Sequence, residues 1–300
     1  MITSTWRVFS DSLRCPTDRA LLLESAASLD CDKCGSRFPL DAGFPDFREA
    51  SRSSISEPDV WTETQREWEQ SEAFVDARMQ ERNDDAAVAI YSRMPPLVGQ
   101  VLDVGGSYGL VRRFTQPGCE LLVVDPWPGV LAQADRFAKD PAYRKVCPFI
   151  VEPFAFLCGY AEALPIADGQ FDFVHMRSML DHASDPSLAL SEAHRVLKPA
   201  GRVIIGLSVS GSPTGSPALQ PGIRGLLGSA RLKYRLSGPM GLMKSVVRRV
   251  KSGEFLHDHH IWHPSADDLR DMISDVGFSV ESEQWQTPPF DHVLFIVGLK

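Results

Sequence analysis

The 300-residue sequence lacks any run of eighteen apolar residues, and its opening stretch, MITSTWRVFSDSLR, has no apolar core followed by a small-residue cleavage site. Membrane-spanning helices need the first feature and secretory signals the second. With only six cysteines, a chain of this size does not read as a disulfide framework either. We therefore expect a cytoplasmic protein with no transmembrane segment and with reduced thiols.

Positive charge is also in short supply. The formal net charge of -8 argues against a protein that coats nucleic acid with its whole surface, although a local basic patch could still bind a polyanion. Apolar residues make up 43% of the chain, enough for a large core. The length suits a sheet-and-helix core of about 200 residues with additions.

A glycine turn follows the apolar strand in VLDVGGSYG, residues 101–109. The dinucleotide pattern G-x-G-x-x-G is absent, and D-x-G-G-x-x-G stands in its place, which positions Asp103 for a cationic or amine-bearing ligand. We expect residues 110–114 to open a helix whose N-terminus faces that ligand. Three glycines allow the sharp turn and the close approach of a ligand: Gly105, Gly106 and Gly109.

A second signal lies about 20 residues further on, the usual spacing of a ribose-binding acid. The stretch CELLVVD, residues 119–125, is a short apolar strand that ends in Asp125. A carboxylate at that place accepts hydrogen bonds from the ribose hydroxyls of a nucleotide-type cofactor. The two linked signals predict a cofactor site at the carboxyl ends of two neighbouring strands.

With these motifs, and through residues 159–206, GYAEALPIADGQFDFVHMRSMLDHASDPSLALSEAHRVLKPAGRVIIG, the chain resembles the class I S-adenosylmethionine-dependent methyltransferases of type 11. The resemblance implies that the glycine turn holds the methionine end of the cofactor, that Asp125 binds its ribose, and that residues 161–162 meet its adenine. By position, the implied cofactor-binding residues are Asp103, Gly105, Gly106, Gly109, Asp125, Pro126, Ala161, Glu162, Met176 and Arg177.

Two positions depart from the family pattern. Ser107 replaces the usual middle glycine, and Tyr160 stands where an aspartate is common. These departures imply weaker cofactor binding or a differently held adenine.

The order of elements predicts an α/β fold. A strand at 171–176, a helix at 186–197 and a strand at 202–206 alternate as in a parallel, doubly wound sheet. Ser265 is a helix cap, Gly277 closes that helix, and two strands follow. We therefore expect a Rossmann-like, seven-stranded, doubly wound sheet with an antiparallel last strand. Three parts are predicted: a zinc-ribbon-like domain at 1–50, a helical cap or linker at 51–98, and the S-adenosylmethionine-binding domain at 99–300 with a basic insertion at 207–256.

Thiols and a carboxylate near the N-terminus form a possible zinc site, composed of Cys15, Asp18, Cys31 and Cys34. This segment resembles the zinc ribbons that precede some methyltransferase domains, including rRNA guanine methyltransferases, and a small ribbon protein that activates several RNA and protein methyltransferases. Those ribbons have cysteine where this chain has Asp18. A ribbon that folds without metal is the alternative. Cys119, Cys147 and Cys158 are interpreted as inert core thiols.

Two further segments suggest contacts with the cofactor or the substrate. An apolar stripe, Trp61, Trp68, Phe74 and Met79, predicts helices that lie over the cofactor site or simply pack in the core. Residues 222–253 contain eight Lys or Arg and no acid. This basic stretch is a lid for an anionic substrate, a solvated helical excursion, or an amphipathic segment resting on a membrane surface.

Histidines supply the remaining candidates. In HDHHIWHP, His259, His260 and His263 are predicted to contact substrate or transfer a proton, with a metal site or a structural loop as alternatives. His182 is placed at the carboxyl edge of the sheet, where an imidazole could deprotonate an acceptor or could serve a structural role.

Methyl transfer asks mainly for placement of the acceptor, so no residue is assigned as catalytic beyond His182. The leading hypothesis is a methyltransferase acting at oxygen or nitrogen of an anionic small molecule or glycan. The second is an RNA base methyltransferase, which the acidic charge and the missing N-P-P-Y motif oppose. The third is a cofactor-binding scaffold without turnover.

Overall fold

The computed structural model describes residues 4–40, 42–51, 87–209, 264–286 and 293–300, together with Pro239 and Met243. The N-terminal elements, with η for a 3-10 helix, are η1 (Trp6–Ser12), β1 (Leu22–Glu24), β2 (Ser28–Cys31), β3 (Arg37–Pro39) and α1 (Arg48–Ser51). The first half of the main sheet comprises β4 (Gln100–Val104), η4 (Leu110–Phe114), β5 (Glu120–Asp125), α4 (Val130–Lys139), α5 (Pro141–Val146), η5 (Pro148–Val151) and β6 (Ala155–Cys158). The second half comprises η6 (Ala161–Ala163), β7 (Phe171–Arg177), η7 (Leu180–His182), α6 (Pro186–Val196), β8 (Leu197–Ser208), α8 (Ala266–Val276), β9 (Ser279–Trp285) and β10 (Val293–Leu299).

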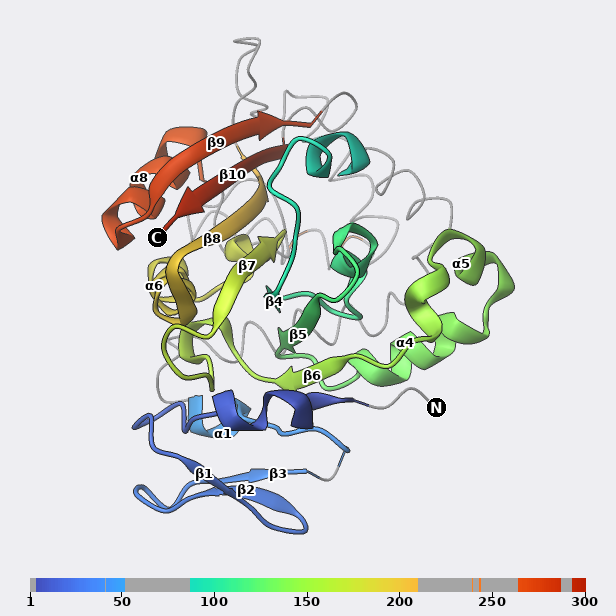
Figure 1. Cartoon of the computed structure of the whole chain (residues 1–300), viewed down its shortest axis with the longest axis vertical. Coiled ribbons are helices and arrows are strands. Elements are labelled where there is room, and N and C mark those ends of the chain that lie inside the picture. The colour runs from blue at the N-terminus through green and yellow to red at the C-terminus, as the bar shows by residue number, and fades with distance from the viewer. Residues whose placement is uncertain are drawn as a thin grey trace.

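Seven strands form the main sheet in the order β6-β5-β4-β7-β8-β10-β9, which Figure 1 shows as a twisted layer running from green to red. Strands β4 to β8 pair in parallel, and β10 runs antiparallel to both of its neighbours. The strand order reverses at β4, and the carboxyl ends of β4, β5 and β7 meet there. Ligands of open α/β sheets bind at such a reversal. The predicted seven-stranded sheet with an antiparallel last strand is confirmed.

Both faces of the sheet are buried, which explains why its inner strands read as continuous apolar runs. In β8, Val203 and Ile205 belong to one core, whereas Ile204 between them belongs to a second core on the other face. The first core takes in α6 and α8, and the second takes in residues 90–97 and η4. Strand β8 therefore separates two apolar layers.

The C-terminal helix forms as predicted. The Ser265 hydroxyl accepts the N–H of Asp268, whose carboxylate accepts the N–H of Ser265, so the two residues form a capping box. Gly277 ends the helix with φ 106°. Two expectations need correction. The helix expected to open at residues 110–114 is a 3-10 helix of five residues, closed where Thr115 donates to the Arg112 carbonyl, and the strand expected at 202–206 extends over Leu197–Ser208.

The small antiparallel sheet β1-β2-β3 lies beside the β6 end of the main sheet (Figure 1, blue). Backbone bonds join the two parts. Phe47 donates to the Cys158 carbonyl at 2.8 Å, Cys158 donates to Pro45 at 2.9 Å, and Thr5 donates to Phe154 at 3.0 Å. The N-terminal segment thus covers the exposed edge of β6, which would otherwise offer unpaired backbone groups.

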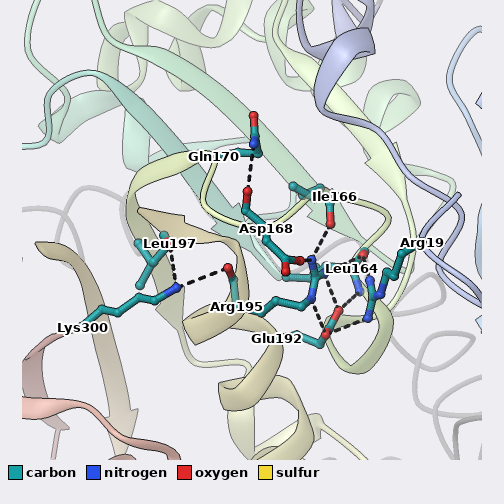
Figure 2. A network of polar contacts seen from close by, with 9 residues as sticks. All are labelled: Arg19, Leu164, Ile166, Asp168, Gln170, Glu192, Arg195, Leu197 and Lys300. Carbon is teal, nitrogen blue, oxygen red and sulfur yellow. Dashed lines mark hydrogen bonds and ion pairs between the residues drawn. The ribbon is translucent and has the colours of Figure 1, made fainter. Parts of the chain in front are cut away.

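Side chains bind the two parts as well. Figure 2 shows Arg19, from the N-terminal segment, bonded to Glu192 of α6 at 2.8 Å and to the Leu164 carbonyl at 2.8 Å. Glu192 also pairs with Arg195, which contacts Asp168. Trp6 and Phe38 share one buried core with the main sheet. Residues before the expected boundary at residue 50 are therefore packed against the seven-stranded sheet.

Several predicted features lie outside the described residues. They are Trp61, Trp68, Phe74 and Met79 of the expected cap, nearly all of the basic insertion, and His259, His260 and His263. Among the residues that the structure describes, no helix is long and apolar enough to cross a membrane.

Candidate cofactor site at the carboxyl edge of the sheet

The glycine turn after β4 forms the floor of the candidate site. Gly105 and Gly109 have φ of 69° and 71°, which favours glycine. A Cβ on Gly105 would lie 2.6 Å from Cβ of Met179. A Cβ on Gly106 would overlap the carboxylate of Asp103, which lies directly beneath it. The turn is therefore closely packed as well as sharply bent, and larger residues do not fit at Gly105 or Gly106.

Asp125, at the end of β5, is buried and holds the same turn from the other side. Its carboxylate accepts the N–H of Ser107 at 3.0 Å and the N–H of Trp127 at 2.9 Å. Ser107 has φ 47°, and Ser178, after β7, has φ 50°. Strained backbone of this kind persists where the surroundings fix it, and it gathers at functional sites. Ser107, which replaces the family glycine, is thus held in a glycine-like backbone conformation by Asp125, the residue predicted to bind the ribose.

Burial raises the pKa of Asp125 to about 6, although its two backbone hydrogen bonds act in the opposite direction. A raised pKa means that the protonated Asp125 carboxyl stabilises the fold. That stabilisation is fully present below the unfolded pKa and is lost as the pH rises through about 6. For the ribose binding that the family resemblance predicts, the sign is reversed, because only an ionised Asp125 could accept both hydroxyls while keeping its backbone partners.

We therefore expect the affinity for S-adenosylmethionine to decrease as the pH falls through about 6. Calorimetric titrations at pH 8, 7, 6 and 5 measure this dependence. Asp125→Asn is the matched control, since its amide does not ionise, and its pH profile should be flat. A wild-type profile that is equally flat would contradict the assignment.

Arg112 is a structural residue of the site that sequence reasoning missed. Its guanidinium donates to the carbonyls of Gly109 at 3.1 Å and Tyr108 at 3.0 Å, both within the glycine turn. It also lies 5.1 Å and 4.8 Å from the ring centroids of Phe149 and Phe154. Burial lowers the pKa of Arg112 to about 10. A cation two residues inside a predicted helix gives no sign in the sequence that it bonds back to the preceding loop.

Beneath Asp103, two residues that the sequence did not single out form a hydrogen-bonded chain. Asp103 Oδ1 lies 2.7 Å from His175 Nδ1, and His175 Nε2 lies 2.5 Å from the hydroxyl of Tyr91. His175 lies within β7 and is 4% exposed. One signal was available, since a histidine at that position of the strand shares a face with Phe173 and Arg177 and lies next to Asp103 in the parallel register.

The predicted adenine-contacting residues occupy different settings. Ala161 is buried at the start of η6, and the Pro126 carbonyl accepts the Cys158 thiol at 3.4 Å. The Glu162 carboxylate turns toward α6, where it accepts the N–H of Ser184 at 2.8 Å and that of Asp185 at 3.3 Å. Its pKa is raised by burial. In this structure Glu162 thus holds the backbone just before α6, whose N-cap is Asp185.

At the end of β7 the predicted neighbours point to opposite faces. Met176 is buried in the core that includes α6. The Arg177 guanidinium lies 5.9 Å from the Phe295 ring centroid on the face shared with Asp103 and His175. His182, in η7, is partly exposed, with Nε2 4.0 Å from Asp181. Of these residues, Arg177 and His182 present polar groups at the carboxyl edge.

The N-terminal cysteine cluster assembles as the sequence predicts. Its four ligand atoms, one each from Cys15, Asp18, Cys31 and Cys34, lie within 4.8 Å of one another. Cys15 Sγ is 3.6 Å from Cys34 Sγ, and Cys31 Sγ is 3.5 Å from Asp18 Oδ1. Burial raises the pKa of the Cys15 thiol to about 12, whereas hydrogen bonding with Ser36 lowers that of Cys34.

Comparison with known proteins agrees with this geometry. A family model described as a methyltransferase domain matches residues 102–205. The ubiquinone/menaquinone biosynthesis C-methyltransferase UbiE of Marinomonas sp. (strain MWYL1) is 31% identical over 186 residues, which are 61% of this chain and 68% of that protein. The chain belongs to the S-adenosylmethionine-dependent methyltransferases. UbiE of Escherichia coli O1:K1 / APEC is also 31% identical, over 59% of this methyltransferase and 65% of its own length.

Two solved structures are also similar to this methyltransferase. An S-adenosylmethionine-dependent methyltransferase from Mesorhizobium loti gives a TM-score of 0.47 at 16% identity, covering 72% of this chain and 98% of that one. The complex between the Haloferax volcanii Trm112 methyltransferase activator and a methyltransferase gives a TM-score of 0.47 at 17% identity, covering 74% and 91%. The methyltransferase spans about two thirds of the length of its UbiE relatives.

Proposed function

We propose that this methyltransferase binds S-adenosylmethionine at the carboxyl ends of β4 and β5 and transfers its methyl group to a small-molecule acceptor. The observation that carries the proposal is the pair of buried carboxylates, Asp103 and Asp125, on either side of one glycine turn. Asp103 would face the methionine end of the cofactor and Asp125 would face its ribose. Both groups suit a ligand with a cationic amine and neighbouring hydroxyls.

The residues of the chain supply binding and orientation. Asp125 would hold the ribose, the glycine turn would allow close approach of the backbone, and Ala161 would meet the adenine through its main chain. When bound, S-adenosylmethionine supplies a methyl group that its sulfonium already activates. Holding the acceptor in line can provide much of the rate enhancement. His182, partly exposed in η7, is our candidate for taking a proton from an acceptor that has to lose one.

The similarity to UbiE proteins supports a small-molecule acceptor and adds carbon to the oxygen and nitrogen considered from the sequence. An anionic or glycan acceptor rests on the basic stretch 222–253. RNA is the second candidate, which the ribbon-like sheet and its cysteine cluster favour. Binding of RNA with a steep salt dependence would distinguish that case.

The experiment that tests the cofactor assignment is a calorimetric titration of purified protein with S-adenosylmethionine, S-adenosylhomocysteine and NADH. We expect micromolar binding of the first two and none of NADH. Acceptor screening would then begin with anionic metabolites and quinone precursors. Failure of both adenosyl compounds to bind would overturn the proposal.

We further propose that Cys15, Asp18, Cys31 and Cys34 bind a structural zinc ion. Tetrahedral zinc has bonds of about 2.3 Å to sulfur and about 2.0 Å to oxygen. Its ligand atoms are therefore about 3.8 Å apart for two sulfurs and about 3.5 Å apart for a sulfur and an oxygen. The corresponding distances are 3.6 Å and 3.5 Å. Asp18 also accepts the N–H of Ala20 at 3.0 Å, which orients its carboxylate toward the thiols. The donor set therefore fits zinc.

Replacement of Cys31 by serine should remove most of the bound zinc and lower the thermal midpoint, because a structural metal site contributes directly to folding. Elemental analysis of protein from zinc-supplemented culture measures the metal content, with about one zinc per chain expected in the wild type. Cys119→Ser, outside the cluster, is the control and should keep its zinc. A metal-free wild type would show that the ribbon folds without metal.

A further inference from the structure

We propose that His175 and Tyr91 are positioning residues for the cofactor, which act by holding Asp103 in the orientation that receives the amino group of S-adenosylmethionine. This inference rests on the proposed cofactor site. It assigns a role to two residues that neither the glycine turn nor the ribose acid explains.

The first step is the geometry of Asp103. Its Oδ2 lies against Gly106, so the carboxylate reaches beneath the glycine turn instead of pointing away from it. Its Oδ1 is bonded to His175 Nδ1 at 2.7 Å. A short buried side chain with one oxygen fixed has a single orientation left. His175 therefore determines where the other oxygen of Asp103 lies.

The second step is the state of the imidazole. A neutral His175 with its proton on Nδ1 donates to Asp103 and accepts the Tyr91 hydroxyl on Nε2, so every polar atom of the chain has a partner. The Asp103 carboxylate favours this tautomer, because it can only accept from Nδ1, which leaves Nε2 to accept from the Tyr91 hydroxyl. Hydrogen bonds to an ionised carboxylate are the strong ones, which makes the inner bond worth more than the outer bond.

The third step is what fixes Tyr91. Its ring stacks on Phe114 with centroids 3.9 Å apart and planes 6° apart. It also makes a T-shaped contact with Phe295, with centroids 5.8 Å apart. Phe114 belongs to η4, directly after the glycine turn, and Phe295 belongs to β10. Tyr91 lies in the helical residues 87–91. These hydrogen bonds and ring contacts thus link residues 87–91, the glycine turn, β7 and β10 to the Asp103 carboxylate.

A structural role and a positioning role predict different ligand dependence. S-adenosylmethionine and S-adenosylhomocysteine carry the amino acid end, whereas 5′-methylthioadenosine has the same nucleoside without it. Loss of a positioning residue should weaken the first two ligands and leave the third unchanged. General damage to the site should weaken all three.

The experiment measures the dissociation constants of these three compounds by calorimetry for the wild type and four variants. Tyr91→Phe should weaken S-adenosylmethionine by about 2- to 10-fold and His175→Phe by about 10- to 100-fold, the scale of one neutral and one charge-assisted hydrogen bond. His175→Asn keeps an N–H near the Nδ1 position and should recover most of the loss. Ser12→Ala removes a hydroxyl that donates to Gln170 at 3.1 Å, next to the amino end of β7 and away from the glycine turn, and it should have no effect.

Weaker S-adenosylmethionine binding by Tyr91→Phe, with its affinity for 5′-methylthioadenosine within about 2-fold of wild type, would support the inference even if His175→Phe fails to fold. Equal weakening of all three ligands, or unchanged S-adenosylmethionine affinity in Tyr91→Phe and His175→Phe, would overturn it. A wild type that binds none of them would instead refute the proposed function.

Discussion

Gly106→Ala is expected to weaken S-adenosylmethionine binding by about 10- to 100-fold, the cost of inserting a methyl group into a closely packed site. The added Cβ would overlap the carboxylate of Asp103, which has to move away. Because Asp103 is bonded to His175 at 2.7 Å, that movement also breaks the buried hydrogen bond. One methyl group would thus displace Asp103, the acid that we propose faces the amine end of the cofactor.

Calorimetric titration with S-adenosylmethionine measures this effect, and thermal unfolding reports whether the fold survives. Gly118→Ala is the control: it places a side chain at a φ of 84° in open space, so it tests the general cost of replacing a glycine. Its cofactor affinity should equal that of the wild type. If Gly106→Ala binds S-adenosylmethionine as tightly as the wild type does, the present position of Asp103 is not needed for binding.

Asp125→Ala is expected to weaken S-adenosylmethionine binding by about 1 to 3 kcal/mol, because the ribose hydroxyls lose a charged acceptor. The fold should persist. Removal of a buried carboxylate whose pKa is raised relieves a desolvation cost, which offsets part of the loss of its bonds to Ser107 and Trp127.

The measurement again pairs calorimetry with thermal unfolding. Asp135→Ala removes a carboxylate that pairs with Lys139 on the surface of α4, and it should change neither binding nor stability by much. An Asp125→Ala variant that binds the cofactor normally would show that another group holds the ribose.

The two variants probe opposite sides of one loop. Asp103 lies beneath the turn and Asp125 holds the Ser107 N–H from the neighbouring strand. If both are needed, the double variant should lose less than the sum of the two single losses, because residues that share one loop do not act independently.

Local signals identified much of this protein. The glycine turn, the acid at the end of β5 and the capping box at Ser265 each occupy a few consecutive residues, and each forms where expected. Glu162 shows the limit of such signals. Its position matches an adenine contact, and no local pattern shows that its carboxylate also accepts the N–H groups of Ser184 and Asp185, 22 and 23 residues away in the sequence.

The sequence by itself determined the sheet, the order of its elements and the identity of the two carboxylates, because strand periodicity, turn glycines and caps are set by near neighbours. Only the tertiary structure decided which side chains meet. Tyr91 and His175 are 84 residues apart, and His175 and Asp103 are 72 apart. Their contact depends on the parallel register of β4 with β7 and on rings from two other segments, and no short stretch of sequence encodes either.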